Sequence, residues 1–300
     1  MSLAVAVPLG VASSLVYGTC IVFQHRESHN EGQEDARHLL SLLKQPRWLA
    51  AVFGDFAGFL LNAAALAAGP VVVIQPLVVL MLPVALVVGW LVGGPRPLWI
   101  DYLSSLAIVA GLSGFLILIG KPGEGHAPRA RWFALAVLIV LAIGAAMSLA
   151  VRSQRSVVRG AVYGAAAGMY FGTLGVMVDG LSDVVSHRGW FGLVSTGRGV
   201  IPLIGLALLG ISGIVLTQVS FQVGKLAATL PANTATDPFV AVLLGAVLLH
   251  EHIPLSAGHL IAYAICLAVV TLGAIRLARN TVVTHPDERG AEQPAEPLSE

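Results

Sequence analysis

The chain has 300 residues, of which 56% are hydrophobic and 11% charged, and its mean hydropathy is +0.84. A water-soluble domain of this length could not bury so large an apolar fraction, so the composition excludes a soluble protein. It predicts an all-α polytopic membrane protein whose first partner is the lipid bilayer. The formal net charge is +1 and the chain has no strongly basic run, which argues against a nucleic-acid partner.

About nine segments are long and apolar enough to cross ~30 Å of hydrocarbon as helices. In chain order they are residues 3–24, 48–68, 70–92, 99–120, 131–151, 157–180, 199–222, 227–250 and 256–278. The polar stretches 25–47 and 181–198 are candidate surface helices. Residues 279–300 combine prolines with acidic side chains and predict a disordered cytoplasmic tail.

Lys and Arg are distributed unequally between alternate loops. Twelve follow the first, third, fifth, seventh and ninth segments, and five follow the others. The positive-inside rule places the richer side in the cytoplasm. We therefore expect a multi-pass protein of the cell membrane, with its N-terminus outside and its C-terminus inside.

The sequence repeats itself at a spacing of 155 residues. Without a gap, four pairs of glycines and prolines coincide: Gly58 with Gly213, Gly69 with Gly224, Pro76 with Pro231 and Pro83 with Pro238. Because five crossings separate equivalent segments, the two repeats have opposite orientations in the membrane. We expect a first repeat of four helices in residues 1–120, a connecting helix in 121–156 and an inverted repeat of four helices in 157–278.

An acid and an amide lie at membrane depth in the eighth segment. Asp237 is about halfway along it, where a charge costs about 2.5 to 3.5 kcal/mol, so its side chain should face the bundle interior or a cavity. Asn233 lies one turn earlier on the same helix face. These groups predict an ion-binding or substrate-binding site. In the other interpretation, Asp237 only bonds a neighbouring helix.

Proline and glycine mark two further features of the spans. Four prolines remove backbone donors and predict hinges or broken helices with free carbonyls: Pro76, Pro83, Pro231 and Pro238. Four glycines recur every fourth residue in the sixth segment: Gly160, Gly164, Gly168 and Gly172. Such a line predicts close helix packing, and in a transporter it could also serve as a sliding surface.

A second polar stripe supplies the remaining candidate residues for binding or coupling. Asp55 and Asn62 share one face of the second segment, and the repeat places Thr217 opposite Asn62. Three glutamines complete the set: Gln218 and Gln222 at an i, i+4 spacing in the seventh segment, and Gln75 before Pro76. Each amide is also a common interhelical hydrogen-bonding group.

Two long motifs resemble a known transporter family. Residues 54–94, GDFAGFLLNAAALAAGPVVVIQPLVVLMLPVALVVGWLVGG, and 210–251, GISGIVLTQVSFQVGKLAATLPANTATDPFVAVLLGAVLLHE, resemble the paired-helix core of the EamA-like drug/metabolite transporter (DMT) superfamily. The first-helix ending VYGTCIVFQHRES is similar to actinobacterial integral membrane proteins related to NIPA-type magnesium transporters. The resemblance covers about residues 5–278. Typical members have ten helices in two sets of five, so this chain departs from the pattern.

The sequence contains no phosphate-binding glycine loop, no His-Glu-x-x-His and no Cys or His cluster with metal-ligand spacing, so we expect neither an enzyme nor a cofactor. The leading hypothesis is a secondary transporter that moves a small metabolite or amphiphile, with Asp237 carrying a coupling proton. A magnesium or divalent-cation transporter is the alternative that the resemblance implies. A non-transporting membrane scaffold or lipid-binding protein is the third hypothesis. The sequence assigns no set of metal ligands, and it does not decide between a monomer and a homodimer.

Overall fold

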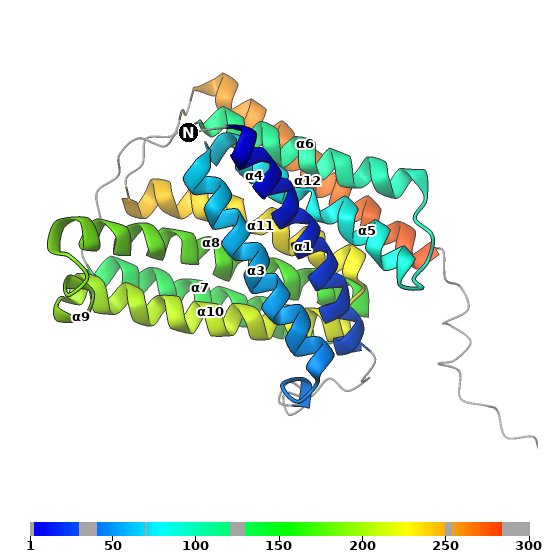
Figure 1. Cartoon of the computed structure of the whole chain (residues 1–300), viewed down its shortest axis with the longest axis horizontal. Helices are drawn as coiled ribbons and strands as arrows, with labels where there is room; N and C mark the ends of the chain where they lie inside the picture. Colours follow the sequence, from blue (N-terminus) through cyan, green and yellow to red (C-terminus); the bar gives the residue numbers. More distant parts are fainter. Residues whose placement is uncertain are drawn as a thin grey trace, which may run out of the picture.

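The computed structural model describes residues 3–29, 41–69, 71–120, 130–249, 254 and 256–283, and this part of the chain is a bundle of helices (Figure 1). The expected tail beyond residue 283 lies outside the described residues. The helices are α1 (Leu3–His29), α3 (Pro46–Ala68), α4 (Val71–Val79), α5 (Met81–Leu91), α6 (Trp99–Ile119), α7 (Ala130–Ala150), α8 (Ser156–Arg188), α9 (Gly192–Ser195), α10 (Gly197–Val223), α11 (Leu226–Leu244), the π-helix η1 (Gly245–Leu249) and α12 (Ala257–Val283).

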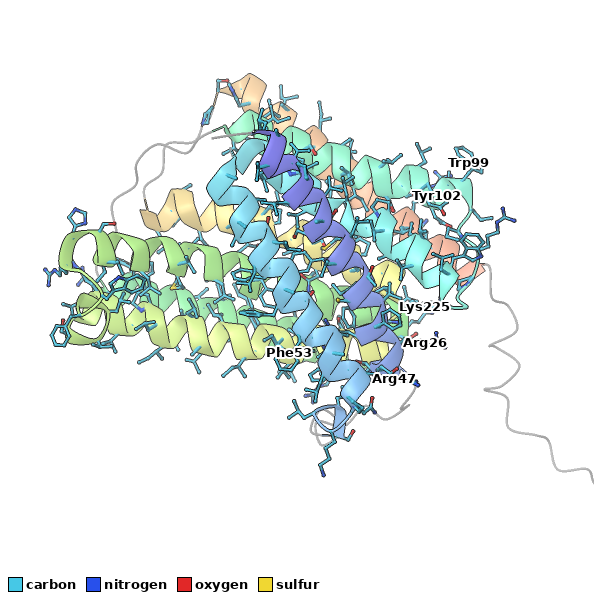
Figure 2. All side chains as sticks on the ribbon, viewed as in Figure 1. Arg26, Arg47, Phe53, Trp99, Tyr102 and Lys225 are labelled. Atoms are coloured by element: carbon cyan, nitrogen blue, oxygen red, sulfur yellow. The ribbon has the colours of Figure 1, made fainter. Side chains whose placement is uncertain are left out.

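Eight of the described helices are long and apolar enough to cross a membrane: α1, α3, α6, α7, α8, α10, α11 and α12. Large apolar side chains point outward from them. On α3, Phe53 is 70% exposed, Phe56 58% and Phe59 53%, and Figure 2 shows Phe53 on the outer surface. A soluble monomer rarely exposes so much contiguous apolar surface. The described part of the chain therefore has the architecture of a multi-pass membrane protein.

The expected third span is divided in the structure. Residues 70–92 were expected to form one helix, but α4 and α5 are separated at Leu80. Pro83 has no N–H to donate to the carbonyl of Val79, so the helical ladder is interrupted at this point. The nine expected spans thus become eight long helices and one divided segment.

Helix α11 runs unbroken through Pro231 and Pro238, so the expectation of a broken helix around Asp237 was wrong. Hydroxyl groups next to the prolines bond the helix's own carbonyls: Thr234 Oγ1 donates to Leu230 O at 2.9 Å, and Thr236 Oγ1 donates to Ala232 O at 2.8 Å. Close packing against α8, described below, also holds this helix straight.

Two helices end in the same way 155 residues apart. At the end of α3, Gly69 is extended and its N–H donates to Ala65 O at 2.9 Å. At the end of α10, Gly224 is extended and its N–H donates to Ser220 O at 2.9 Å. A new helix starts within two residues of each glycine, so both turns are tight.

The next pair of helix ends also corresponds at this spacing. After α5, the N–H of Gly94 bonds the carbonyl of Gly89, five residues earlier, at 2.9 Å. The π-helix η1, which is defined by bonds of that same i to i+5 type, occupies Gly245–Leu249. Shifting η1 back by 155 residues places it on residues 90–94.

The helices that precede α7 and the helices that follow it pack against one another in a similar order. Helix α1 packs against α3, α4 and α5, and helix α8 packs against α10 and α11. Helix α6 packs against α4 and α5, α12 packs against α11, and α6 and α12 lie side by side along one edge (Figure 1). Helix α7 packs against α8 and α10. Its Phe133 and Val137 enter a buried apolar cluster with Met177 and Leu209.

The polar stretches proposed as surface helices extend the spans only in part, and residues 41 and 42 of the first stretch are helical but separate from α3. Residues 25–29 continue α1, and residues 30–40 lie outside the described residues. Residues 181–188 continue α8, whose 33 residues reach about 50 Å, farther than a bilayer core is thick. Only the four residues of α9, Gly192–Ser195, form a separate helix in the second stretch.

The basic side chains gather at one end of the bundle. Figure 2 shows Arg26, Arg47 and Lys225 near the same end, where α1 ends, α3 begins and α10 turns into α11. Arg96 lies in the connection from α5 to α6 and lines a cavity together with Arg26 and Lys225. Basic residues from three of the five loops that the charge count assigned to one side therefore lie at the same end of the bundle.

Candidate functional site

Helix α1 contributes a polar face to the centre of the bundle. Tyr17, Gln24 and Ser28 are spaced by seven and four residues, which places them on one side of the helix. Gln24 and Ser28 are buried. Because water is absent from such a position, their polar atoms need partners on other helices.

A hydrogen-bonded network links this face to α3 and α10. Ser28 Oγ donates to Gln218 Oε1 at 3.0 Å, and Trp48 Nε1 donates to the same oxygen at 3.2 Å. Gln218 Nε2 in turn donates to Gln24 Oε1 at 2.9 Å. Two donors on its oxygen fix the orientation of the Gln218 amide, and that amide fixes the orientation of Gln24.

The network ends at Asp55 on α3. The Gln24 amide nitrogen lies 3.5 Å from Ala51 O, one turn before Asp55, and the Gln24 side chain lies within interaction range of the Asp55 carboxyl group. The other carboxyl oxygen, Oδ1, is buried and has no hydrogen-bond partner among the described residues. Oδ1 therefore lacks a hydrogen bond in this conformation, and a proton, a cation or a polar ligand that reached it would supply a partner.

Glycines on α3 bring α1 close to this carboxyl group. A Cβ added at Gly58 would lie 3.3 Å from the Tyr17 ring, and Ser13 Oγ donates to Gly58 O at 2.9 Å. One turn away, Gly54 packs against the Cys20 sulfur. The short side chains allow α1 to place an aromatic hydroxyl group next to the polar stripe of α3.

Asp237 approaches the same region from α11. Its side chain is partly buried, and its main-chain carbonyl lies against Gly172 of α8. Tyr17 is within electrostatic range of both Asp237 and Asp55. The two predicted acids, from helices far apart in the sequence, therefore both lie within electrostatic range of one tyrosine.

The glycine line of α8 is a packing surface for α11. A methyl group added at any of the four glycines would overlap main-chain atoms of α11 or of the turn before it. The contacts are Gly160 with Gly224, Gly164 with Thr229, Gly168 with Asn233 and Gly172 with Asp237. This line therefore packs against α11, and it sets the position of both candidate polar residues of α11.

The remaining predicted residues are less closely associated. Asn233 Nδ2 donates to Thr217 Oγ1 of α10 at 3.2 Å, so this pair joins two helices. Asn62 Oδ1 and Gln222 Nε2 are buried without a hydrogen-bond partner in the described part of the chain. The side chain of Gln75 lies outside the described residues.

Two cavities open beside these helices. The larger, about 500 Å³, lies at the basic end between α1, α5, α11 and α12, and reaches Leu230 and Pro231. The smaller, about 270 Å³, lies between α8, α11 and α12 and is mainly apolar. Neither cavity is lined by Asp55 or Asp237.

The described residues contain no group of three or more His, Cys, Asp or Glu side chains arranged to hold a metal ion. A cation at Asp55 would have to complete its coordination with amide oxygens, carbonyls or water. Mg²⁺ commonly keeps several waters and uses one or two carboxylates, so such a site is chemically feasible.

Sequence reasoning missed Tyr17, Gln24, Ser28 and Trp48. The spacing of the first three forms a stripe along one helix face. The predicted first span ends at residue 24, so it does not include Ser28 and the full stripe is not visible within it. Trp48 stands at the start of α3 and resembles an interfacial aromatic residue. Nothing local in the sequence indicates that its partner is Gln218.

Comparison with known proteins adds one relative. An uncharacterized protein of Corynebacterium glutamicum is 29% identical to this chain over 295 residues, which cover 96% of the chain and 98% of that protein. No family model matches the chain, and no solved structure matches it. The likeness extends along nearly the whole length of both proteins, and it carries no substrate or mechanism.

Proposed function

We propose that the protein is a secondary transporter of the drug/metabolite type, which moves a small metabolite or amphiphile by alternating access between two inverted repeats. The matched helix ends support the repeat. Gly69 and Gly224 end α3 and α10 with equivalent bonds, and η1 corresponds to the five-residue turn at Gly94. In each half, the first helix packs against the second and third.

The observation that carries the proposal is the polar network between α1 and α10. In inverted-repeat transporters, the binding site lies near the midplane where the repeats meet. Gln24 and Asp55 belong to the first proposed repeat and Gln218 to the second, so the network joins the halves, from Ser28 and Trp48 near the helix ends toward Asp55 in the middle of α3. The second acid, Asp237, lies within electrostatic range of Tyr17, which is on the same helix as Gln24.

The roles of the acids follow from their surroundings. Asp55 has a carboxyl oxygen without a hydrogen-bond partner among the described residues, and residues 232–240 of the helix that carries Asp237 are all partly exposed. A carboxyl group in such a position can take up and release a proton as the repeats move. In our proposal Asp237 carries the coupling proton, and Asp55 with its amides binds cargo.

Orientation in the membrane completes the proposal. The end of the bundle that carries Arg26, Arg96 and Lys225 faces the cytoplasm, because basic residues are retained on that side. The N-terminus then lies outside and α12 ends inside. The 500 Å³ cavity would open toward the cytoplasm, which corresponds to an inward-facing state.

A divalent-cation transporter is the second candidate, and one observation favours it. Asp55 Oδ1 is a buried carboxylate oxygen without a partner among the described residues, and Mg²⁺ sites commonly use only one or two carboxylates with water. Acceptor oxygens of this kind are the ligands that Mg²⁺ prefers. The larger number of amide and hydroxyl groups around Asp55 favours an organic cargo.

The test is transport by the purified protein in liposomes that enclose a pH-sensitive dye and a Mg²⁺-sensitive dye, with metabolites and amphiphiles added outside. A proton signal that requires an organic compound supports the proposal. A Mg²⁺ signal without such a compound supports the second candidate. A folded protein that produces neither signal with any compound contradicts both and leaves a scaffold or lipid-binding role.

A further inference from the structure

The larger cavity combines an apolar interior with a basic rim. Its walls include Leu82 and Leu86 of α5, Leu226 and Leu230 of α11, and Leu277 of α12. These side chains come from both halves of the bundle. A ligand in the cavity would therefore place its apolar part between the halves, at the end where the basic loops meet.

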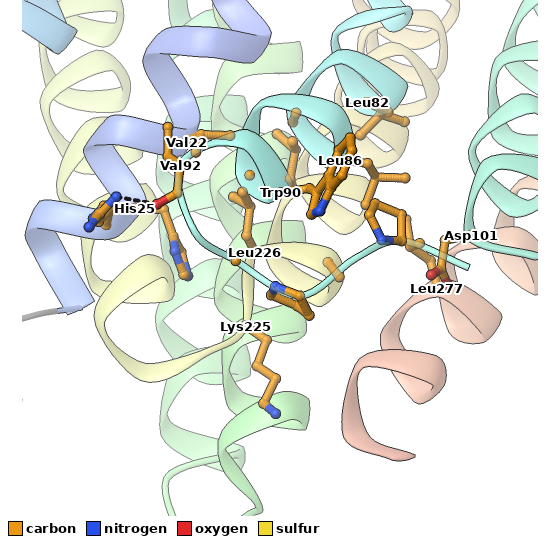
Figure 3. A pocket seen from close by; sticks show the side chains of 18 of the residues that line it. Val22, His25, Leu82, Leu86, Trp90, Val92, Asp101, Lys225, Leu226 and Leu277 are labelled. Atoms are coloured by element: carbon orange, nitrogen blue, oxygen red, sulfur yellow. Dashed lines mark hydrogen bonds between the residues drawn. The ribbon is translucent and has the colours of Figure 1, made fainter. Parts of the chain in front are cut away.

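The charges along the lining are unbalanced. Arg26, Arg96 and Lys225 line the cavity, and Asp101 is the one acidic residue among the lining side chains. Asp101 Oδ2 accepts a hydrogen bond from the N–H of Leu98 at 2.8 Å, so this carboxylate is engaged in capping α6. Figure 3 shows Asp101 at one side of the cavity and Lys225 extending away from the leucines at its mouth. The rim thus presents a net positive field.

Two arginines are held in place by contacts that leave other N–H groups available. The guanidinium of Arg96 lies over the Trp90 ring, 5.8 Å from its centroid, which uses its face and not its N–H edges. Arg26 Nη1 donates to the carbonyl of Val92. A guanidinium has five N–H donors in a planar fork that suits carboxylate or phosphate oxygens.

We propose that this cavity binds an amphiphilic anion, with a phosphate or carboxylate head on Arg26 and Arg96 and an apolar chain against the leucines. The head satisfies the basic rim, and the chain removes apolar surface from water. The anion can be a free amphiphile or the headgroup of an anionic lipid. Only its further role as the cargo that enters from the cytoplasm rests on the proposed transport function.

The binding test uses the full chain in phosphatidylcholine nanodiscs, with 8-bromooctyl phosphate as the probe and 8-bromooctanol as its neutral analogue. Bromine quenches nearby tryptophan, and Trp90 lines the cavity. We expect saturable quenching by the phosphate, loss of that component in Trp90→Phe, and an apparent Kd at least tenfold lower for the phosphate than for the alcohol, once membrane partitioning of each probe is subtracted.

The matched variants remove one charge each. Arg26→Gln and Arg96→Gln should weaken binding of the phosphate by about tenfold. Arg47→Gln removes an exposed charge at the same end that does not line the cavity, so it should leave the Kd unchanged. Equal affinity for the alcohol in the unsubstituted protein overturns the proposal, and this comparison remains decisive if a variant fails to fold. Unchanged binding by both folded variants also overturns it.

Lipid composition distinguishes the two sources of the anion. When a fifth of the lipid is phosphatidylglycerol, competition by a lipid headgroup raises the apparent Kd of the probe, and an unchanged Kd identifies a free amphiphile. Either result supports an anion site. Because binding is measured without transport, a protein that binds the phosphate and transports nothing contradicts the proposed function alone. A protein that transports without selective phosphate binding contradicts the cavity proposal alone.

Discussion

Gln218 Nε2 on α10 donates to Gln24 Oε1 on α1 at 2.9 Å, across 194 positions of the chain. The two amides are buried, and the donors on Gln218 Oε1 come from Ser28 and Trp48. Because Gln24 Oε1 accepts from Gln218, the amide nitrogen of Gln24 faces α3, which carries Asp55. If the proposed repeats rock against each other, this chain of bonds must break or rearrange, so it connects the conformation of the bundle to the carboxyl group.

Replacing Gln218 tests the contribution of the network to stability. Gln218→Leu leaves the donors of Ser28 and Trp48 and the acceptor of Gln24 without partners, and each buried unpaired group costs about 1–3 kcal/mol. We expect a clearly lower thermal midpoint in detergent or nanodiscs. The control is Gln222→Leu on the same helix, because Gln222 Nε2 has no hydrogen-bond partner among the described residues. If both variants melt at the same temperature, the network does not stabilise the bundle.

Substitution of the two acids tests their roles in transport. Asparagine keeps the shape and hydrogen bonding of aspartate but cannot exchange a proton. Asp237→Asn should lower transport at least tenfold and more than Asp55→Asn does, while both proteins remain folded in the membrane. The measurement is the initial rate in liposomes over a range of pH. Wild-type rates for Asp237→Asn at every pH would show that Asp237 only bonds a neighbouring helix.

Alanine substitutions at different glycines of α8 should differ clearly in their effect on thermal stability. Gly168→Ala and Gly172→Ala place a methyl group against the main chain of Asn233 and Asp237, so α11 must move away from α8. Overpacking of this kind costs about 1–3 kcal/mol. Gly175→Ala on the same helix meets no atom within 4 Å and should be neutral. Thermal unfolding of the three variants side by side measures the difference, and equal midpoints would contradict the packing role.

Sequence predicted most of the helices well, because the thickness of hydrocarbon sets the length of an apolar span. It could not predict the different fates of two equivalent prolines. The chain is interrupted at Leu80, just before Pro83, whereas α11 is continuous through Pro238. The difference depends on the neighbouring helix. The glycines of α8 contact the main chain of α11 and hold it straight. The sequence of residues 226–244 alone does not show that α8 is its neighbour.

The candidate site was predicted in part for a similar reason. The energetic cost of a carboxylate in a membrane identified Asp55 and Asp237 from sequence alone. The partners of Asp55 come from helices whose neighbours are set by the whole fold. Gln24 became recognisable once α1 was known to continue past residue 24, and Trp48 once α10 was placed beside α1.

The orientation of the bundle can be tested with cysteines at its two ends. Lys44 and Ser195 are both exposed, and they precede α3 and α10 at opposite ends. In a background with Cys20 and Cys266 replaced by alanine, Lys44→Cys should react with an impermeant thiol reagent only after the membrane is opened, because Lys44 belongs to the loops rich in Lys and Arg.

Ser195→Cys should react in intact cells, and this positive control shows that the reagent reaches the protein. The two sites are compared by the labelled fraction before and after the membrane is opened. Labelling of Lys44→Cys in intact cells together with protection of Ser195→Cys would reverse the topology. The 500 Å³ cavity would then face outward, and its basic rim would receive anions from outside the cell instead of from the cytoplasm.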